Sequence, residues 1–385
     1  MREAKVVLMG RTGFAELPLH SGKAPQWLVK RMIKLAREIS TIIIDEYGRG
    51  VFLQRLSDPY WFQAFGCVLG YDWHSSGVTT VVTGVLKSAL NPEEHGVAVC
   101  GGKGKASMRT QEEIVEVGEK FNLSTGTIER LKYSSRLSAK VDNVAIQAGY
   151  PLYHHAFFMT EDGKWAVIQQ GMSLKDRTAR RYHWLSDAVR SFVVEPHNAI
   201  VGDAKREIAL DMTARESGGC RERSVEVAKE DPRRVARMLK SIRPSYQRSL
   251  KEWIKCGSLH DAGGYVAEFL SMPLTVNWKA LKKVYEFQPR DYEELLGIRG
   301  VGPATVRGLA LISEIIYGEK PSWRDPVKYS FAFGGKDGVP FPVDRRSMDE
   351  SIRILRDAIE QARIGDRERL RSLKRLRRLI PEGEF

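Results

Sequence analysis

The stretch that decides the fold is YHHAFFMTEDGKWAVIQQ, residues 153–170. Two runs rich in aromatic and β-branched side chains flank Glu161–Lys164, a pattern that predicts two antiparallel strands joined by a tight turn. Asp-Gly is the preferred pair for a type I′ turn, so we expect that turn type here. Because helical patterns lie on both sides of this hairpin, residues 1–202 are predicted to form a mixed α/β domain.

Three further segments of the N-terminal part carry secondary-structure signals. Residues 24–44 have apolar side chains at helical spacing, whereas residues 79–85 are rich in β-branched side chains, which favours a strand. Thr110–Glu113 has the spacing of a capping box and predicts a helix that runs to Phe121, with a second helix from Ser124. This pair has the proportions of a helix-turn-helix, or of a simple corner between packed helices.

The C-terminal half is predicted to be helical. Residues 203–257 are highly charged and form either a linker or the start of a second domain, with a break at Ser217–Gly219. Residues 258–385 are expected to follow as one helical unit. The predicted fold class is therefore a mixed α/β N-terminal domain plus an all-α C-terminal domain.

Residues 291–310, DYEELLGIRGVGPATVRGLA, carry the most informative motif of the chain. Asp291 can cap a short helix with Glu294 as its capping-box partner, and Pro303 suits the first position of a second helix. The turn between them contains Gly300 and Gly302. A turn this tight is expected to need positive φ, and missing Cβ atoms let a phosphate approach the backbone amides.

This motif resembles the helix-hairpin-helix of DNA-repair proteins, whose core is hydrophobic-x-Gly-hydrophobic-Gly; residues 298–302 read Ile-Arg-Gly-Val-Gly, within a motif at 291–312. The resemblance implies sequence-independent contacts to phosphate and sugar. A basic tail at residues 363–378 is expected to lie near the hairpin, and the basic loop at 101–105 could hold a phosphate. The residues expected to contact DNA are Arg299, Gly300, Val301, Gly302, Ala304, Thr305, Arg307, Lys103, Lys105, Arg371, Lys374 and Arg375.

The excess of basic residues in the sequence favours a polyanionic partner such as DNA. The 385 residues include 61 Lys and Arg against 48 Asp and Glu, a net charge of +13. The four cysteines lie far apart, which argues against a disulfide framework or a zinc ribbon. Neither a signal peptide nor a membrane-length apolar run is recognisable. We therefore expect a cytoplasmic protein associated with the nucleoid and without a membrane partner.

Over nearly its whole length the chain resembles a largely archaeal conserved family of unknown function. The resemblance implies a family and no activity. It is carried by GFAELPLHSGKAPQWLVKRM (13–32), FGCVLGYDWHSSGVTT (65–80), GGKGKAS (101–107), YHHAFF (153–158), WAVIQQGM (165–172), ARRYHW (179–184) and FAFGGKDGVPFPV (331–343).

Several of these stretches hold polar residues that could form an active site. Asp72, His74, Asp142, His155 and Gln170 are expected to converge on one pocket that faces the DNA-binding region. Asp72 and Asp142 would bind Mg²⁺ or Mn²⁺, while a histidine serves as base. Residues 101–105 lack the spacing of a P-loop, so no nucleotide cofactor is predicted. These features favour a metal-dependent nuclease of DNA processing or repair.

Two alternatives stay open. The segment Pro340–Asp344 follows the hairpin and resembles the Pro-Val-Asp of some helix-hairpin-helix glycosylases, which implies that Asp344 could stabilise an oxocarbenium-like sugar on a flipped nucleotide. Many bifunctional members of that group carry a lysine after Gly-Val-Gly, where this chain has Ala304, Thr305 and Val306. The second alternative is a DNA-binding adaptor without catalysis.

Overall fold

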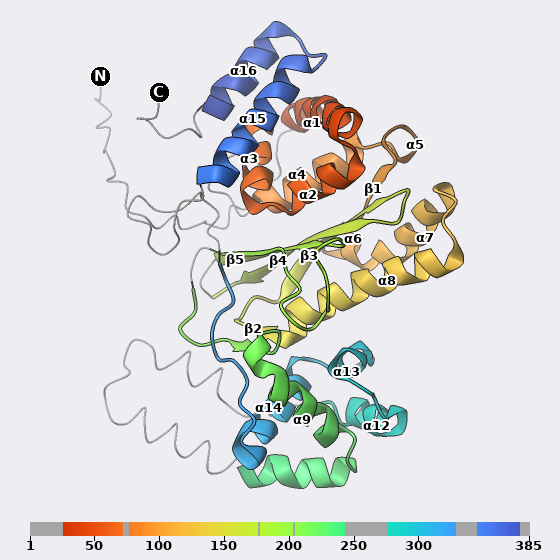
Figure 1. Cartoon of the computed structure of the whole chain (residues 1–385), viewed down its shortest axis with the longest axis vertical. Coiled ribbons are helices and arrows are strands. Elements are labelled where there is room, and N and C mark those ends of the chain that lie inside the picture. Colours follow the sequence, from red (N-terminus) through yellow and green to blue (C-terminus); the bar gives the residue numbers. More distant parts are fainter. Residues whose placement is uncertain are drawn as a thin grey trace, which may run out of the picture.

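The computed structural model describes residues 26–71, 77–175, 178–202, 205–242, 276–328 and 345–377. Its centre is an antiparallel five-stranded sheet with strand order β1-β3-β4-β5-β6 (Figure 1). A second, two-stranded ladder pairs β2 with β7. The strands are β1 (Val97–Lys103), β2 (Ile146–Gln147), β3 (Leu152–Thr160), β4 (Trp165–Ser173), β5 (Thr178–Leu185), β6 (Ala199–Gly202) and β7 (Leu210–Asp211).

The predicted hairpin is confirmed, with a different turn. β3 and β4 pair antiparallel, with Met159 opposite Trp165. Gly163 has φ +78, whereas Asp162 is not among the residues with positive φ, so the turn is not type I′. The amide of Gly163 donates to Thr160 O at 3.0 Å, and the Thr160 hydroxyl accepts from the amide of Lys164 at 3.1 Å. These local bonds favour a type I turn followed by a left-handed glycine.

One face of the sheet is covered by N-terminal helices together with two C-terminal ones (Figure 1). Val99, Phe158 and Ile168 contribute to the hydrophobic core on this face. The helices of this layer are α1 (Gln26–Tyr47), α2 (Arg49–Ser57), α3 (Pro59–Leu69), α4 (Gly77–Ala89), α15 (Arg345–Gln361) and α16 (Asp366–Arg377), and the short α5 (Pro92–His95) leads into β1.

The opposite face supports the remaining helices. Phe157, Val167 and Trp184 belong to the core on this face. The helices are α6 (Lys105–Met108), α7 (Thr110–Lys120), α8 (Thr125–Lys140), the π-helix η1 (Val141–Ala145), the 3₁₀ helix η2 (Arg215–Ser217), α9 (Gly218–Ala228), α12 (Trp278–Phe287), α13 (Tyr292–Gly297) and α14 (Pro303–Tyr317). A further helical segment spans 232–242. No helix in the described ranges has the length and apolar character that a membrane span requires.

Two expectations about secondary structure were wrong. Residues 79–85 lie inside α4 and not in a strand; Val78, Val82 and Val85 recur at helical spacing and are buried, so tertiary packing overrides the β preference of branched side chains. The capping box at Thr110 does not form, because Glu113 accepts instead from the amide of Gly101 at 2.7 Å and from Lys87 at 2.6 Å.

The last two helices do not pack with the predicted helix-hairpin-helix region. α15 and α16 contact α3, α15 also contacts α1, and their apolar residues belong to the core on that face of the sheet. Arg375 donates to Val68 O at 3.0 Å, which fixes α16 to the end of α3. Residues 258–385 therefore do not form one helical unit, since α12–α14 lie across the sheet from α15 and α16 (Figure 1).

A buried ion pair connects the chain after α14 to the sheet. The Arg180 guanidinium on β5 contacts the Asp325 carboxylate at 2.6 Å, and both side chains are 0% exposed. Asp325 also accepts from the amides of Arg206 (2.7 Å) and Val327 (3.1 Å), while the Arg180 guanidinium lies 4.4 Å from the ring centroid of Tyr150. The hydrogen bonds and the stacked ring offset the cost of burying both charges.

We predict that Asp325→Ala lowers the free energy of unfolding by about 3–5 kcal/mol, because it leaves a buried guanidinium without its counter-ion. Asp187→Ala is the matched control, since Asp187 pairs with Lys164 at 2.9 Å with both side chains about half exposed; its cost should be about 0–1 kcal/mol. Urea unfolding of both variants measures the difference. Equal effects would show that Asp325 does not anchor this segment.

Candidate functional site beside the α13–α14 turn

The segment with the Gly-rich motif forms two helices joined by a tight turn. Asp291 caps α13, with its carboxylate accepting from the amide of Glu294 at 2.8 Å, and Pro303 is the first residue of α14. Both features were predicted. The Glu294 side chain does not complete a capping box, because it accepts from the amide of Arg290 at 2.7 Å instead of from that of Asp291.

The two turn glycines have different roles. Gly300 has φ +100, which confirms that this turn needs a left-handed residue. A Cβ at Gly300 would lie 3.0 Å from Ala280 Cβ, so the close approach at this position is made by α12. Gly302 has extended backbone (φ −127, ψ −177), and a Cβ there would meet only Gly300 O at 4.0 Å. Gly302 is therefore the glycine that leaves open space in front of the backbone.

The carbonyl oxygens of the turn are held by side chains of the same protein. Three donors from three different segments reach them, so the acceptors at this end of α14 are already used. Hydrogen bonds run from Asn277 Nδ2 to Gly300 O (3.3 Å), from Lys140 Nζ to Val301 O and from Gln147 Nε2 to Pro303 O (2.9 Å).

The amides at the same end of α14 have no such partners. The N–H groups of Gly302, Ala304 and Thr305 donate to no acceptor in the described part of the chain, and α14 has no side-chain cap. Free N–H groups and the positive end of the helix dipole together form an environment that favours an anion.

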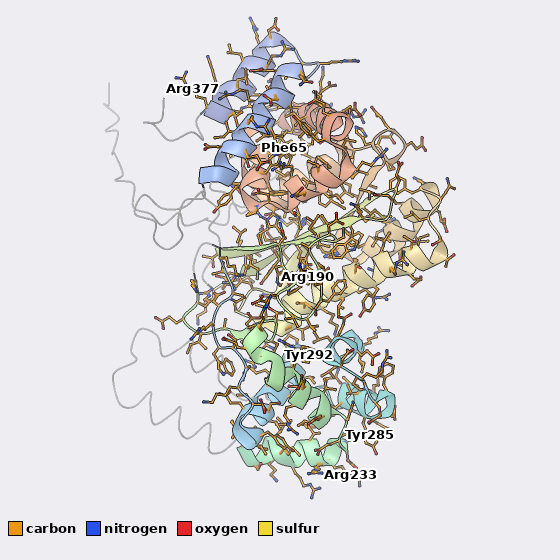
Figure 2. All side chains as sticks on the ribbon, in the orientation of Figure 1. Phe65, Arg190, Arg233, Tyr285, Tyr292 and Arg377 are labelled. Atoms are coloured by element: carbon orange, nitrogen blue, oxygen red, sulfur yellow. The ribbon has the colours of Figure 1, made fainter. Side chains whose placement is uncertain are left out.

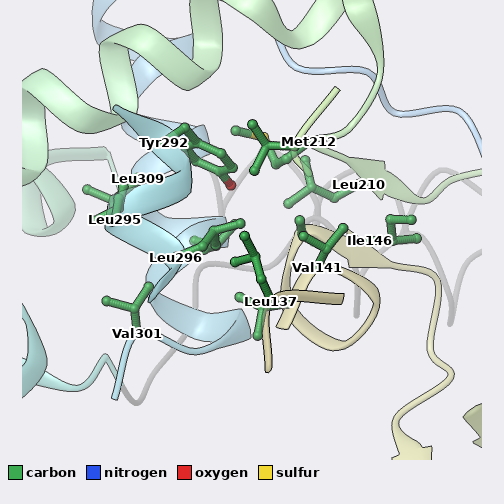
Figure 3. Close-up of a cluster of buried hydrophobic side chains, with 14 of the residues drawn as sticks. Leu137, Val141, Ile146, Leu210, Met212, Tyr292, Leu295, Leu296, Val301 and Leu309 are labelled. Carbon is green, nitrogen blue, oxygen red and sulfur yellow. The ribbon is translucent and has the colours of Figure 1, made fainter. Parts of the chain in front are cut away.

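An apolar cluster fixes the turn relative to α8 and η1 (Figure 3). Leu296 and Val301, predicted to pack the hairpin, are both fully buried. They join residues of α8, η1, β2 and β7 in one core. The labelled members in Figure 3 are Leu137, Val141, Ile146, Leu210, Met212, Tyr292, Leu295, Leu296, Val301 and Leu309.

A cavity of about 660 Å³ opens between this turn, α6–α8 and β3. Three cations line it, namely Arg136, Lys140 and Arg299, and no carboxylate does so among the described residues. Burial lowers the pKa of Lys140, whose ammonium group also donates to the turn. The remaining lining residues are Ser107, Thr110, Gln111, Tyr133, Ser135, Leu137, Ala139, Leu152, Tyr153, His154, His155 and Gly297.

A chain of hydrogen bonds runs from this cavity to a buried carboxylate. Ser135 Oγ lies 2.9 Å from His155 Nε2, and His155 Nδ1 lies 2.7 Å from Gln169 Oε1. The Gln169 amide nitrogen donates to Asp142 and, at 3.1 Å, to Ser138 O. β3 and β4 place His155 opposite Gln169, so both side chains lie on the same face of the sheet.

Asp142 is satisfied by donors and does not face the cavity. Trp184 Nε1 donates to its carboxylate at 2.9 Å, and Gln169 and His197 donate as well. Asp142 is 1% exposed. A metal ion at this carboxylate would have to displace these donors. Within the described ranges no group of three or more His, Cys, Asp or Glu residues could hold a metal, so the predicted Mg²⁺ or Mn²⁺ site has no counterpart there.

The expectation of a single pocket is wrong for Gln170. It follows Gln169 along β4 and therefore points to the opposite face, where it accepts from the Thr79 hydroxyl on α4. Its amide nitrogen also donates to the hydroxyl of Tyr153, which lines the cavity, but Gln170 itself is not among the lining residues. His155 does line the cavity, together with Arg299 of the turn. Asp72, His74 and Asp344 lie outside the described residues.

The predicted DNA contacts separate into two groups. Arg299 and Gly302 lie at the turn, and the Lys103 ammonium lies 5.8 Å from the ring centroid of Tyr153, a cavity residue. Thr305 is 2% exposed, so only its amide could reach a phosphate. Three predicted DNA contacts, Arg371, Lys374 and Arg375, lie on α16, across the sheet from the turn. The other predicted contacts lie at or near the turn and the cavity: Lys103, Lys105, Arg299, Gly300, Val301, Gly302, Ala304, Thr305 and Arg307.

Three cavity residues were not anticipated from the sequence, namely Arg136, Lys140 and Ser135, and Gln169 was not predicted as a site residue. Arg136 and Lys140 lie on α8 at positions that read as an ordinary charged helix face. Gln169 could have been found from strand alternation, because it shares a face with His155 once the register is known.

Three buried histidines predict a loss of stability in acid. Burial lowers the pKa of His154 to about 3 and also lowers the pKa of His155 and His183. Below the ordinary histidine pKa of about 6.5, the unfolded chain then binds protons that the folded protein does not, so the free energy of unfolding decreases as pH falls.

His154→Gln, which keeps a polar partner for Thr83, should reduce the slope of the free energy of unfolding against pH, between pH 6 and 4, by about 1 kcal/mol per pH unit. Urea unfolding at several pH values measures this slope, and an unchanged slope would contradict it.

Comparison with known proteins identifies the family and supplies no relative of known activity. Residues 13–343 match the family described as "Protein of unknown function (DUF763)". No curated protein and no solved structure matches the chain. Because the match covers most of the sequence, the chain belongs to the DUF763 family.

Proposed function

We propose that the protein binds the nucleic-acid backbone through α13, the turn and α14, acting as a helix-hairpin-helix. One observation carries the proposal. At the start of α14, the carbonyl oxygens of the turn are hydrogen-bonded within the protein, while the amides of Gly302, Ala304 and Thr305 find no acceptor within the described ranges. This end of the helix therefore offers only donors, which is the requirement for a phosphate.

Charge around the turn supports the proposal. Arg136 and Arg299 are exposed, and Lys140, which donates to Val301 O of the turn, lines the same cavity. Lys103 and Lys105 extend the positive surface to the β1–α6 corner on the other side of the cavity. Such a track contacts phosphates without reading bases, so we propose sequence-independent binding of DNA, at the nucleoid.

Backbone binding is the element common to the nuclease, the glycosylase and the adaptor considered from the sequence. The carboxylates of a metal-dependent nuclease are not assembled among the described residues, and Asp344 of the glycosylase alternative lies outside them. Nucleic-acid binding is therefore proposed as the function, and a role in DNA processing or repair is the class of activity that it would serve.

The sharpest test is Gly302→Asp. Aspartate is favoured at a helix N-cap and suits the extended backbone here, so the variant should be as stable as the wild type or slightly more stable. Its carboxylate would occupy the free amides and repel phosphate, so DNA affinity should fall by at least about tenfold, or 1.4 kcal/mol. Fluorescence anisotropy with a labelled duplex and thermal unfolding measure the two effects.

Ser124→Asp is the matched control for that variant. Ser124 is the N-cap of α8, so the change also introduces one negative charge at a capped helix start. The 16 residues of α8 separate it from Lys140 and the turn by about 24 Å. Equal losses of affinity in both variants would mean that net charge, and not the α14 amides, governs binding. Gly300 is unsuitable for this test, since any side chain there is strained and meets α12.

Salt dependence tests the backbone character of the interaction. If about five to eight phosphates are contacted, log K should fall against log salt with a slope of about −5 to −7 on duplex DNA. Titrations at several salt concentrations and with unrelated sequences measure the slope and the sequence preference. An affinity that does not change with salt concentration, or a strong preference for one DNA sequence, would be inconsistent with binding to the phosphate backbone.

A further inference from the structure

Ser135 differs from its neighbouring serines on α8. Ser134 donates to Arg130 O at 3.0 Å, and Ser138 donates to Ser135 O at 3.1 Å, which is the usual arrangement of a serine inside a helix. The hydroxyl of Ser135 instead leaves its helix and meets His155 Nε2 at 2.9 Å on the wall of the cavity. It also accepts from Gln111 Nε2 at 3.1 Å.

The direction of each hydrogen bond between Ser135 and Asp142 follows from the groups that end this network, Asp142 and Ser138 O. Asp142 and Ser138 O only accept, so the Gln169 nitrogen must be the atom that faces them, and its oxygen must face His155. His155 Nδ1 then carries the proton and donates to Gln169, which leaves Nε2 as an acceptor. Burial lowers the pKa of His155 and so favours the neutral ring. Ser135 is therefore hydrogen-bonded to a neutral imidazole that can take its proton.

The cavity in front of Ser135 suits a phosphate ester. Arg136, Lys140 and Arg299 line it without a carboxylate among its described residues; Glu293, the nearby acid, is hydrogen-bonded to the Tyr133 hydroxyl at 2.6 Å. Tyr133 and Tyr153 add aromatic surface, and a cavity of about 660 Å³ is large enough for a nucleotide. Three cations therefore line the cavity beside the serine, and one of them, Arg299, belongs to the turn that precedes the free amides of α14.

We propose that Ser135 is a nucleophile for phosphodiesters and that His155 is its general base. For a polymeric substrate the proposal rests on the nucleic-acid binding proposed above. No sequence motif points to this pair, because Ser135 and His155 lie on different elements, α8 and β3, and meet only in the folded protein.

The reaction balances without a further reactant except water. Ser135 Oγ attacks phosphorus as its proton moves to His155 Nε2, and the bond from phosphorus to the leaving alkoxide oxygen breaks as that oxygen takes the proton back from the imidazolium. A phosphoserine diester remains. Water then gives a proton to His155 Nε2 and attacks phosphorus; the bond from phosphorus to Ser135 Oγ breaks, Oγ takes that proton back from the imidazolium, and a phosphomonoester is released. If the alcohol attacks in place of water, the original ester is restored. Arg136, Lys140 and Arg299 stabilise the charge on the phosphoryl oxygens.

The first experiment uses the full-length protein and bis(p-nitrophenyl) phosphate, a diester that needs no DNA binding, in the presence of a chelator. Ser135→Ala should reduce the rate by at least about 100-fold, because the variant has no nucleophile for the covalent step. Ser134→Ala, the matched control one residue away, should keep the rate. Thermal unfolding of both variants checks that the fold is intact. No turnover by the wild type, or equal turnover by Ser135→Ala, overturns the proposal.

A second variant tests access to the nucleophile without depending on turnover. Ser135 is 2% exposed but lines the cavity, so in Ser135→Cys peptide mass spectrometry should find position 135 alkylated by iodoacetamide in the folded protein. The fully buried thiols of Cys100 and Cys220 should react slowly, and reading each peptide separately keeps Cys256 out of the comparison. An introduced thiol that reacts no faster than Cys100 and Cys220 overturns the proposal, because a nucleophile must be reachable from the cavity.

The third experiment identifies the source of the phosphodiester. Incubation with end-labelled single-stranded and duplex DNA, followed by denaturation and peptide mass spectrometry, should give a phosphonucleotide adduct on Ser135 that Ser135→Ala lacks. Hydrolysis of the small diester without a DNA adduct supports the nucleophile and assigns it to small phosphodiesters. If Ser135→Ala loses hydrolysis of the small diester, the role of Ser135 as nucleophile is supported. If Gly302→Asp then binds DNA normally, the proposed DNA binding through the α14 amides is contradicted while the role of Ser135 stands.

Discussion

The arrangement on the α8 face of the sheet depends on one buried carboxylate. Asp142 lies in η1, directly after α8, and receives hydrogen bonds from Gln169 on β4, Trp184 on β5 and His197 before β6. A carboxylate at 1% exposure is tolerated only with such donors. The requirement sets where the end of α8 lies on the sheet. It also orients the Gln169 amide, and through it the ring of His155 and the hydroxyl of Ser135.

The turn and the cavity are connected parts of the same structure. Lys140, the last residue of α8, donates to Val301 O and also lines the cavity. Leu137, Val141, Leu296 and Val301 belong to the apolar cluster that joins α8 and η1 to the turn (Figure 3). Arg299 of the turn lines the same cavity as Lys140. The outer face of α12, with Tyr285, points away from this core, whereas Tyr292 is buried within it (Figure 2).

Local patterns were the part of the fold that the sequence could predict. The β3–β4 pairing, the Asp291 cap, Pro303 at the first position of α14 and the left-handed Gly300 all follow from neighbouring residues. Long-range contacts could not be predicted in this way. The docking of α16 on α3, the helical state of residues 79–85 and the Ser135–His155 contact depend on packing between distant segments. Single histidines and carboxylates likewise do not reveal strand register, which is why the sequence pointed to Gln170 although Gln169 is the residue that shares the face of His155.

In the proposed function, the start of α14 and the cavity beside it form the nucleic-acid-binding surface. Hydrogen–deuterium exchange of the full-length protein, with and without a saturating short duplex, tests it most directly because exchange reports on backbone amides. We expect slower exchange in peptides that cover residues 298–306 and 133–140, with no change over 366–377 on α16. Protection confined to α16, or spread evenly over all basic segments, would contradict it.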